Sequence, residues 1–471
     1  MNVTWRVYTP YFELDPDGHA QELSFENNIV LPWCKLTNED KAVLSWKEDD
    51  RNTGAFGTVR GVLMRKSSHG FTESLEGRLK LKKNGFALKR LHPLKPGGAD
   101  EDEFKRLFQH EVKQLKRFSG HTERHLVLLL VSFEWKNDKH FLFPYADCTL
   151  SDYWERNQDA PPHDRHHMEW LSQQVYGLMK AVSKIHDGLV ESDPGNGQME
   201  RRYGRHGDIR PDNILWFRTT DSELGILVLS DMGLSSFNSE VSKSYVSKTK
   251  VTAIPVCHPP ECVVKGGKVN RTFDVWSLGC VFLEIIAWSL GGLEYLQEFR
   301  GERATPSMRG WKELVFYEVG QRSGERGQNI YSVKVKPQVI DVSTIILMRR
   351  TQLTKGLQWI SKMHGHEDCT PFMHDVLDTI GIEMLTVLSD GVKRTTSDLL
   401  ADQFQAFNEK PKGGYYTRPT PDLSRSPLQN PEVEVGLDFD SYELSNGIHF
   451  AKHHGRLLQP PTRQELSDTS G

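Results

Sequence analysis

A polar segment near the middle of the chain carries side chains suited to chemistry on phosphates. Residues 206–215 have the sequence His-Gly-Asp-Ile-Arg-Pro-Asp-Asn-Ile-Leu, and Asp231 follows an apolar run further on. An aspartate can orient an attacking hydroxyl and accept its proton, and an asparagine with a second aspartate can hold magnesium against phosphates. Asp208, Asn213 and Asp231 have this combination. The segment therefore predicts phosphoryl transfer, with Asp208 as the catalytic carboxylate and Asn213 and Asp231 as the metal ligands.

A glycine-containing turn lies closer to the start of the chain. Residues 52–59 have the sequence Asn-Thr-Gly-Ala-Phe-Gly-Thr-Val, which fits a turn between two strands. Gly54 and Gly57 would let backbone amides approach a phosphate closely. Such a turn is more often an ordinary hairpin, and Asn52 stands where a nucleotide-binding loop has its first glycine. The turn supports phosphate binding only together with its neighbours.

A lysine and a glutamate form the third element of the pattern. Lys89 ends the apolar run 86–89, where strand alternation places it on the same face as Ala87. Glu111 lies in the apolar stripe of a predicted helix, 102–118, and a buried carboxylate needs a cation. We expect Lys89 to pair with Glu111, which would hold the lysine over the phosphates of a nucleotide. A solvated lysine and a glutamate at the edge of the core are the alternative.

The elements that must position these residues divide the chain into two lobes. Residues 46–145 hold short strand-like runs around one helix, which predicts a small, mainly antiparallel β lobe. Residues 146–407 have helical periodicity, with an apolar stripe over 171–185 and an almost wholly apolar segment, 274–290, typical of a central buried helix. The predicted fold class is α+β with two lobes.

The two ends of the chain lack such periodicity. Residues 1–45 fit a short extension that lies on the β lobe. Residues 408–471 are rich in Pro, Ser, Asn and charge, so we expect a disordered tail.

Composition and charge restrict the class of partner. The 471 residues have a net charge of -4, which gives no reason to expect a nucleic acid. The six cysteines are scattered without paired spacing, which favours a reducing compartment. The chain starts without a signal-like segment, and the longest apolar stretch, 278–290, contains Glu284 and is too short to span a bilayer. We expect a cytoplasmic or nuclear protein without a membrane span.

Two groups of histidines are candidate metal ligands. They are His163, His166 and His167, and the set His364, His366, Cys369 and His374. Their spacings do not follow the usual zinc patterns, so we expect solvated or helix-surface histidines instead.

In chain order these motifs resemble the eukaryotic-type protein kinase family over about residues 50–406. The family's later landmarks appear as Pro-Pro-Glu at 259–261, Asp-Val-Trp-Ser-Leu-Gly at 274–279 and Lys-Arg-Thr at 393–395. The resemblance implies that Glu261 pairs with Arg394 and that Asp274 braces the backbone of the catalytic loop.

The resemblance also implies ATP and Mg²⁺ as cofactors and a protein as substrate. Val59, Ala87 and Leu215 would enclose the adenine. Phe143 would be the gatekeeper before a hinge, 144–146. The implied nucleotide-binding residues are Asn52, Gly54, Gly57, Val59, Ala87, Lys89, Phe143, Tyr145 and Leu215. The implied apolar column between the lobes is Leu129, Leu115, Met232 and His206.

The catalytic loop departs from the family pattern. Gly207 replaces an arginine that would bind a phosphate on the activation segment, so we predict regulation without a phosphorylation switch in residues 235–252. Arg210 replaces a lysine and keeps a positive charge near the transferred phosphate, as a further catalytic residue beside Asp208, Lys89 and Glu111. Pro211 favours serine/threonine specificity.

A pseudokinase, which keeps the fold and binds nucleotide without transfer, is the first alternative. The chain resembles divergent kinases of filamentous fungi in the departures above, in the polar insertion 188–205 and in the long stretch between Gly57 and Lys89. Catalysis is favoured because the catalytic set is complete: Lys89, Glu111, Asp208, Asn213 and Asp231.

A small-molecule phosphotransferase of the aminoglycoside or choline kinase type is the second alternative, because its catalytic loop is similar. The landmarks at 259–261, 274–279 and 393–395 favour a protein kinase.

Overall fold

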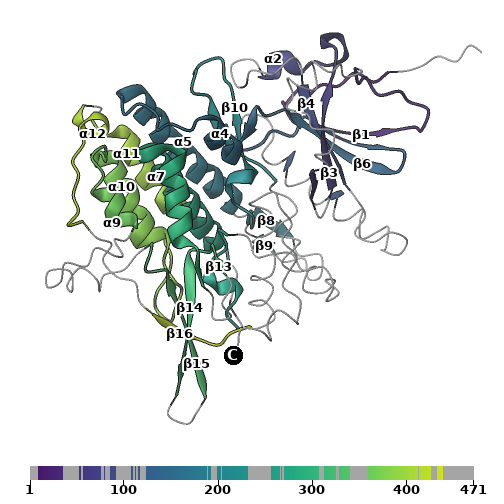
Figure 1. Cartoon of the computed structure of the whole chain (residues 1–471). Helices are drawn as coiled ribbons and strands as arrows, with labels where there is room; N and C mark the ends of the chain where they lie inside the picture. Colours follow the sequence, from purple (N-terminus) through teal and green to yellow (C-terminus); the bar gives the residue numbers. More distant parts are fainter. Residues whose placement is uncertain are drawn as a thin grey trace, which may run out of the picture.

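The chain folds into a β-rich lobe and a larger helical lobe (Figure 1). The computed structural model describes residues 9–34, 52–54, 57–75, 79, 85–91, 108–109, 112, 115–116, 123–187, 189–192, 199–202, 204–231, 256–265, 267, 270–306, 312–324, 328–339, 359–411, 413–425 and 432–438. The predicted α+β fold with two lobes is confirmed.

A six-stranded sheet with the order β1-β5-β6-β4-β3-β2 forms the β-rich lobe. All neighbours are antiparallel except β1 and β5. The strands are β1 (Gln21–Phe25), β2 (Asn52–Gly54), β3 (Gly57–Leu63), β4 (Gly85–Leu91), β5 (Val131–Trp135) and β6 (Asp138–Pro144). Two short helices, η1 (Lys66–Ser68) and α2 (Phe71–Leu75), occupy part of the long connection between β3 and β4.

The N-terminal extension is built into this lobe rather than only resting on it. β1 adds a parallel edge strand to the sheet. Phe12 is fully buried, and its ring stacks on Trp33 with a centroid distance of 5.8 Å and contacts Phe133 of β5. Residues 9–34 therefore contribute to the core of the lobe.

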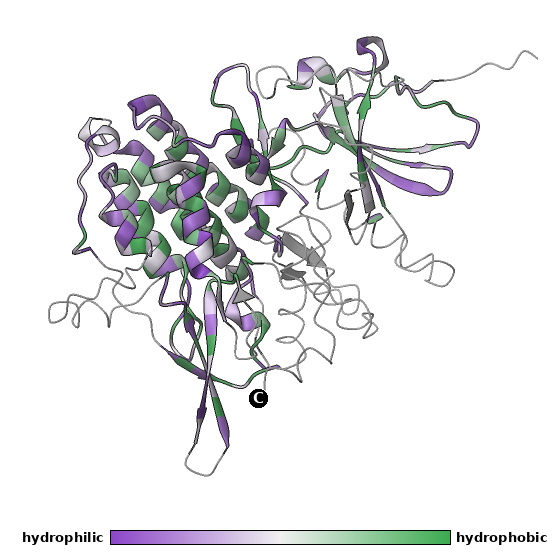
Figure 2. Ribbon diagram, in the orientation of Figure 1, coloured by the Kyte–Doolittle hydropathy of each residue, from purple (hydrophilic) through white to green (hydrophobic). Residues whose placement is uncertain are grey.

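One long apolar helix forms the centre of the helical lobe. α7 (Thr272–Arg303) contains 32 residues and is kinked at Gly291 and Gly292, the latter with φ 70°. Figure 2 shows its hydrophobic residues among the surrounding helices. Among the described residues it alone is long and apolar enough to cross a membrane, but its apolar window is 100% buried inside the protein, as in a core helix.

The other helices of this lobe surround α7. They are α4 (Leu150–Arg156), α5 (Arg165–His186), α9 (Trp359–His364), α10 (Pro371–Thr379), the π-helical η4 (Ile380–Met384), α11 (Ser397–Glu409) and α12 (Gly414–Thr417). The apolar stripe of α5 is buried, as its periodicity predicts.

Short strands complete the lobe. β7 (Cys148–Thr149), β10 (Ile214–Phe217) and β11 (Ile226–Leu229) form a sheet in the order β11-β10-β7. The short 3-10 helix η2 (Pro211–Asn213) directly precedes β10, and a second one, η3 (Pro260–Cys262), comes later in the chain. Two-stranded pairs are formed by β8 (Leu189–Ser192) with β9 (Met199–Arg202), and by β12 (Thr305–Pro306) with β13 (Lys312–Glu313). β14 (Tyr317–Ser323) and β15 (Asn329–Val335) form a hairpin that extends away from the helices, and β16 (Val433–Val435) pairs with β15 (Figure 1).

The expectation of a disordered tail is wrong for residues 413–425 and 432–438. Tyr416 of α12 is 1% exposed and packs on Phe372, with ring centroids 5.4 Å apart. A single aromatic ring and a three-residue strand give no periodic pattern in a polar sequence, so neither could be recognised. The boundaries of the four predicted segments stay predictions.

Candidate active site

A hairpin in the helical lobe brings the predicted catalytic residues together. The Asp208 loop, residues 206–213, runs directly into β10, which pairs antiparallel with β11. At the end of this pair, the backbone N–H and the hydroxyl of Ser230 both donate hydrogen bonds to the carbonyl of Asn213 at 2.9 Å. Asp231 follows Ser230, so the strand pairing places it beside the loop.

The carboxylate of Asp208 is held on one side only. The side-chain amide of Asn213 donates to Asp208 Oδ2 and to the Asp208 carbonyl, both at 2.8 Å. Asp208 Oδ1 is buried and has no hydrogen-bond partner in the described part of the chain. An oriented carboxylate with one unsatisfied oxygen is ready to accept a proton from a hydroxyl.

Burial and a neighbouring cation shift the pKa of Asp208 in opposite directions. Partial burial raises the pKa of Asp208 above its ordinary value of 3.8, and the positive charge of Arg210 offsets part of this rise. Arg210 Nε lies 3.7 Å from Asp208 Oδ2, while Arg210 Nη1 donates to Asp212 at 2.9 Å. Arg210 thus places a cation at the edge of the loop.

Lys89 reaches across from the β-rich lobe to Asp231. Lys89 Nζ lies 2.8 Å from Asp231 Oδ1, and the lysine side chain is 9% exposed while that of Asp231 is 52% exposed. The lysine charge lowers the pKa of Asp231, so the carboxylate stays ionised. Asp231 has φ 59°, a strained conformation for a residue other than glycine that occurs often at functional sites.

A buried aspartate of α7 holds the start of the Asp208 loop. Asp274 Oδ2 accepts a hydrogen bond from the His206 N–H at 2.7 Å, and Asp274 Oδ1 accepts one from the Gly207 N–H at 2.8 Å. Gly207 has φ 79°, which glycine adopts without strain. The expected bracing by Asp274 is confirmed.

Sequence reasoning missed the second contact of this aspartate. His186, the last residue of α5, lies 2.8 Å from Asp274 Oδ2 through Nε2 and 2.7 Å from the Ser397 hydroxyl through Nδ1. A histidine at the end of an apolar helix was the only available signal, and the contacts join segments far apart in sequence.

His206 links the loop to β11. Its Nδ1 accepts the Asp208 N–H at 3.2 Å, so its Nε2 carries the proton that is donated to the Ser230 carbonyl at 2.7 Å. His206, Leu115 and Leu129 of the expected apolar column are buried. Met232, its fourth member, lies outside the described residues.

A buried ion pair in the helical lobe joins Glu261 of η3 to Arg394. Arg394 Nη1 donates to Glu261 Oε1 at 2.9 Å, and the two side chains are 0% and 7% exposed. Arg394 also donates to the carbonyls of Thr272 and Thr386 at 2.8 Å. The expected pairing of Glu261 with Arg394 is confirmed.

Comparison with known proteins agrees with this geometry. Residues 70–291 match the protein kinase domain family. The matched region, 70–291, supports the resemblance of the chain to the eukaryotic-type protein kinase family. The chain is similar to cyclin-dependent kinase 14 of Oryctolagus cuniculus, Mus musculus and Homo sapiens, with 23% identity over 175 residues. The match covers 37% of this chain and 32% of each relative, so it spans about a third of the relatives' own length.

The sheet of the β-rich lobe brings several expected nucleotide-binding residues together. Strand register sets Val59 opposite Lys89 and Ala87 opposite Phe143. Ala87 and Phe143 are partly buried, and Val59 is 37% exposed. Leu215 of β10 is also partly buried, in the helical lobe. Their roles in nucleotide binding stay predictions.

The remaining expected nucleotide-binding residues lie in the β2–β3 hairpin and next to the start of β4. Asn52 pairs with Val59, and Gly54 pairs with Gly57, in the hairpin of β2 and β3. The Tyr145 N–H donates to the Gly85 carbonyl at 3.3 Å, which ties the expected hinge to β4.

Glu111 lies outside the described residues. The pairing of Lys89 with Glu111 therefore stays a prediction.

The expectation of solvated or helix-surface histidines is right for His166 and His167. It is wrong for His163, whose Nε2 lies 2.7 Å from the Ser289 carbonyl, and for three side chains of the second group. His166 is exposed on α5, and His167 is partly exposed there. His364, Cys369 and His374 are instead buried, at 0%, 0% and 2% exposure. The turn between α9 and α10 folds these three side chains inward, which their spacing in sequence did not indicate.

Proposed function

We propose that this chain is an ATP-dependent protein kinase that transfers the γ-phosphoryl group of ATP to a serine or threonine hydroxyl. The observation that carries the proposal is the state of Asp208, whose Oδ2 is fixed by Asn213 while Oδ1 is buried without a partner in the described part of the chain. A protein hydroxyl placed at Oδ1 would supply the missing hydrogen bond.

The chemical step is a displacement at phosphorus. The substrate oxygen forms a bond to the γ-phosphorus, the bond between that phosphorus and the oxygen of ADP breaks, and the hydroxyl proton passes to Asp208. Arg210 places a positive charge near the transferred group. Most of the acceleration comes from positioning and electrostatics.

Two side chains are suited to Mg²⁺. Asn213 uses its amide nitrogen on Asp208, so its carbonyl oxygen is the ligand atom, and Asp231 uses Oδ1 on Lys89, so its Oδ2 is the ligand atom. Magnesium bound there would neutralise charge on the ATP phosphates. Lys89 would bind the α and β phosphates.

Serine/threonine specificity rests on Pro211 in the Asp208 loop, which resembles the serine/threonine pattern. The six free cysteines support the expected cytoplasmic or nuclear location. A pseudokinase scaffold and a small-molecule phosphotransferase remain the alternatives.

One assay separates these functions. The purified chain is incubated with γ-labelled Mg-ATP and a basic protein, and in parallel with an aminoglycoside or with choline. We expect label on the basic protein alone, confined to serine and threonine by phosphoamino-acid analysis. Label on tyrosine would refute the specificity, and label on a small molecule would refute the protein kinase. No transfer, with ATP still raising thermal stability, would establish the pseudokinase.

A further inference from the structure

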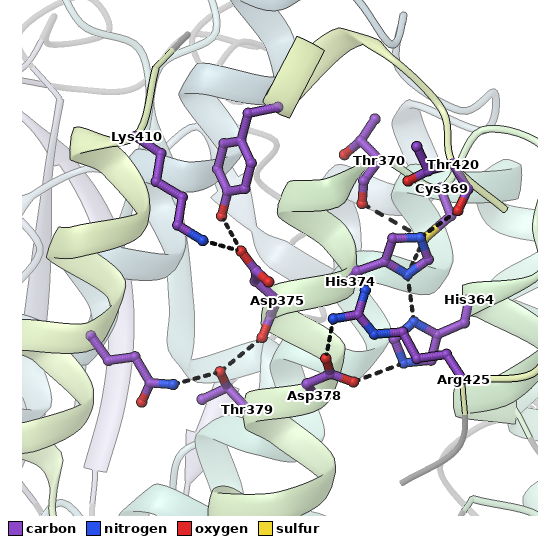
Figure 3. A network of polar contacts seen from close by, with 12 residues as sticks. His364, Cys369, Thr370, His374, Asp375, Asp378, Thr379, Lys410, Thr420 and Arg425 are labelled. Carbon is purple, nitrogen blue, oxygen red and sulfur yellow. Dashed lines mark hydrogen bonds and ion pairs between the residues drawn. The ribbon is translucent and has the colours of Figure 1, made fainter. Parts of the chain in front are cut away.

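A buried cluster of two histidines and a cysteine lies in the helical lobe, apart from the proposed active site. His364 ends α9, Cys369 lies in the following turn, and His374 lies in the first half of α10. Figure 3 shows the three side chains directed toward one another. Their candidate ligand atoms all lie within 4.8 Å of one another.

One of the two distances in this cluster already suits a tetrahedral metal site. His374 Nδ1 lies 3.6 Å from Cys369 Sγ and 2.6 Å from His364 Nδ1. Zinc bonds of about 2.05 Å to nitrogen and about 2.3 Å to sulfur, at tetrahedral angles, separate nitrogen from sulfur by about 3.6 Å and two nitrogens by about 3.3 Å. The cysteine and His374 already have this spacing. The two imidazoles would part by about 0.7 Å on binding.

The outer nitrogen of His374 is hydrogen-bonded and that of His364 faces a carboxylate, which favours the inner nitrogens as acceptors. His374 Nε2 lies 2.7 Å from the Thr420 carbonyl, and a carbonyl only accepts, so this nitrogen carries the proton. His364 Nε2 faces the carboxylate of Asp378 at 3.3 Å. A carboxylate that faces His364 Nε2 favours the tautomer with the proton on this nitrogen.

In these tautomers the inner nitrogens of the two rings point their lone pairs at each other across 2.6 Å, which is repulsive unless a cation lies between them. A shared proton would satisfy the two rings but gives Cys369 no role. In the described part of the chain, the acceptors of its thiol are the Thr370 carbonyl, at 4.0 Å, and His374. A metal would convert this thiol to a thiolate and release the proton to solvent.

We propose that His364, Cys369 and His374 form a structural zinc site. Nitrogen and thiolate sulfur are the donors that zinc prefers in proteins, and a carbonyl or carboxylate behind each ligating imidazole is the usual second layer of such sites. Three protein ligands leave the fourth tetrahedral position to a water molecule.

The position of the site indicates what zinc would stabilise. The Thr420 N–H donates to the Cys369 carbonyl, and the Asp422 N–H donates to the His364 carbonyl, both at 2.8 Å. Arg425 contacts Asp378 at 2.7 Å. Zinc would therefore fix the turn between α9 and α10 together with residues 420–425.

Cobalt titration of the metal-free full-length chain, without nucleotide, tests the site. Tetrahedral Co²⁺ absorbs strongly in the visible range, and a thiolate ligand adds a charge-transfer band in the near ultraviolet. We expect the wild type to develop both features with one equivalent of Co²⁺ and to lose them when Zn²⁺ is added. A folded wild type without the charge-transfer band would overturn the proposal, whatever the variants do.

Three variants assign the ligands. Cys369→Ser should abolish the charge-transfer band, and Asp378→Asn, behind His364, should weaken cobalt binding about 10- to 100-fold. Cys34→Ser, which alters a partly exposed cysteine of the β-rich lobe, should leave the spectrum unchanged. A band that survives in Cys369→Ser or disappears in Cys34→Ser would overturn the assignment. Circular dichroism verifies the folding of each variant, and the wild-type spectrum decides the question where a variant does not fold.

Discussion

At the scale of single residues, the two oxygens of Asp208 have different surroundings. Oδ2 is fixed by the amide of Asn213, and Oδ1 is buried without a partner in the described residues. Because the ring of His206 accepts the Asp208 N–H, the backbone of the residue is fixed as well. The carboxylate is therefore oriented before a substrate arrives, which is how positioned groups lower a barrier.

The pH dependence of the reaction should report the surroundings of Asp208. Its carboxylate accepts a proton only when ionised, and partial burial raises its pKa above 3.8. Activity should therefore rise with pH through an apparent pKa above 3.8, while Asp231, whose pKa Lys89 lowers, stays ionised across that range. The pH profile of kcat/KM for the protein substrate measures this, with circular dichroism verifying that the protein stays folded. An acid limb centred below 3.8 would contradict the assignment.

Only part of the site could be predicted from the residues. Asp208 and Asn213 lie in one short motif, so their spacing in sequence indicates their proximity in space. The contact of His186 with Asp274 and Ser397 joins three distant segments, and the zinc cluster depends on how one turn folds. Neither arrangement leaves a local pattern.

At the scale of elements, the pair Glu261–Arg394 fastens η3 to the segment before α11. Glu261→Ala would leave the Arg394 guanidinium buried without its carboxylate. Removing one partner of a buried pair costs about 3–5 kcal/mol. We expect the free energy of unfolding, measured by denaturant titration, to fall by about this amount.

A matched glutamate provides the control. Glu434 of β16 pairs with Arg322 of β14, and both side chains are more than half exposed. Glu434→Ala should lower the free energy of unfolding by less than about 1 kcal/mol. Equal losses in Glu261→Ala and Glu434→Ala would show that burial of the first pair has no energetic consequence.

The elements with strong local patterns were predicted and the others were not. The apolar segment 274–290 became the core of α7, and the stripe over 171–185 became the buried face of α5. β1 was missed because its partner, β5, lies more than a hundred residues away and five residues of alternation are a weak signal.

At the scale of the whole molecule, segments from both ends of the chain pack on the lobes. Residues 9–34 add β1 and Phe12 to the β-rich lobe. Tyr416 packs on Phe372 of α10, and its hydroxyl donates to the Phe407 carbonyl at 3.2 Å. Segments outside the matched family region therefore contribute to folding.

Tyr416→Ala should destabilise the helical lobe. Replacing a buried aromatic side chain with alanine costs about 3–5 kcal/mol, because it removes apolar contact and leaves a cavity. Tyr11→Ala, at a tyrosine that is 53% exposed, should cost far less. Thermal and denaturant unfolding of both variants measure the difference. A Tyr416→Ala protein as stable as the wild type would mean that α12 is not part of the folded lobe.

The most direct test of the proposed kinase is the initial rate of phosphate transfer from Mg-ATP to a basic protein, compared between wild type, Asp208→Asn and Asp390→Asn. Asparagine keeps the size of Asp208 but cannot accept the proton, so the rate should fall by about 10²- to 10⁴-fold while ATP still raises thermal stability. Asp390 is exposed, and Asp390→Asn should transfer phosphate at the wild-type rate. Equal rates in wild type and Asp208→Asn, or transfer by neither, would contradict the account.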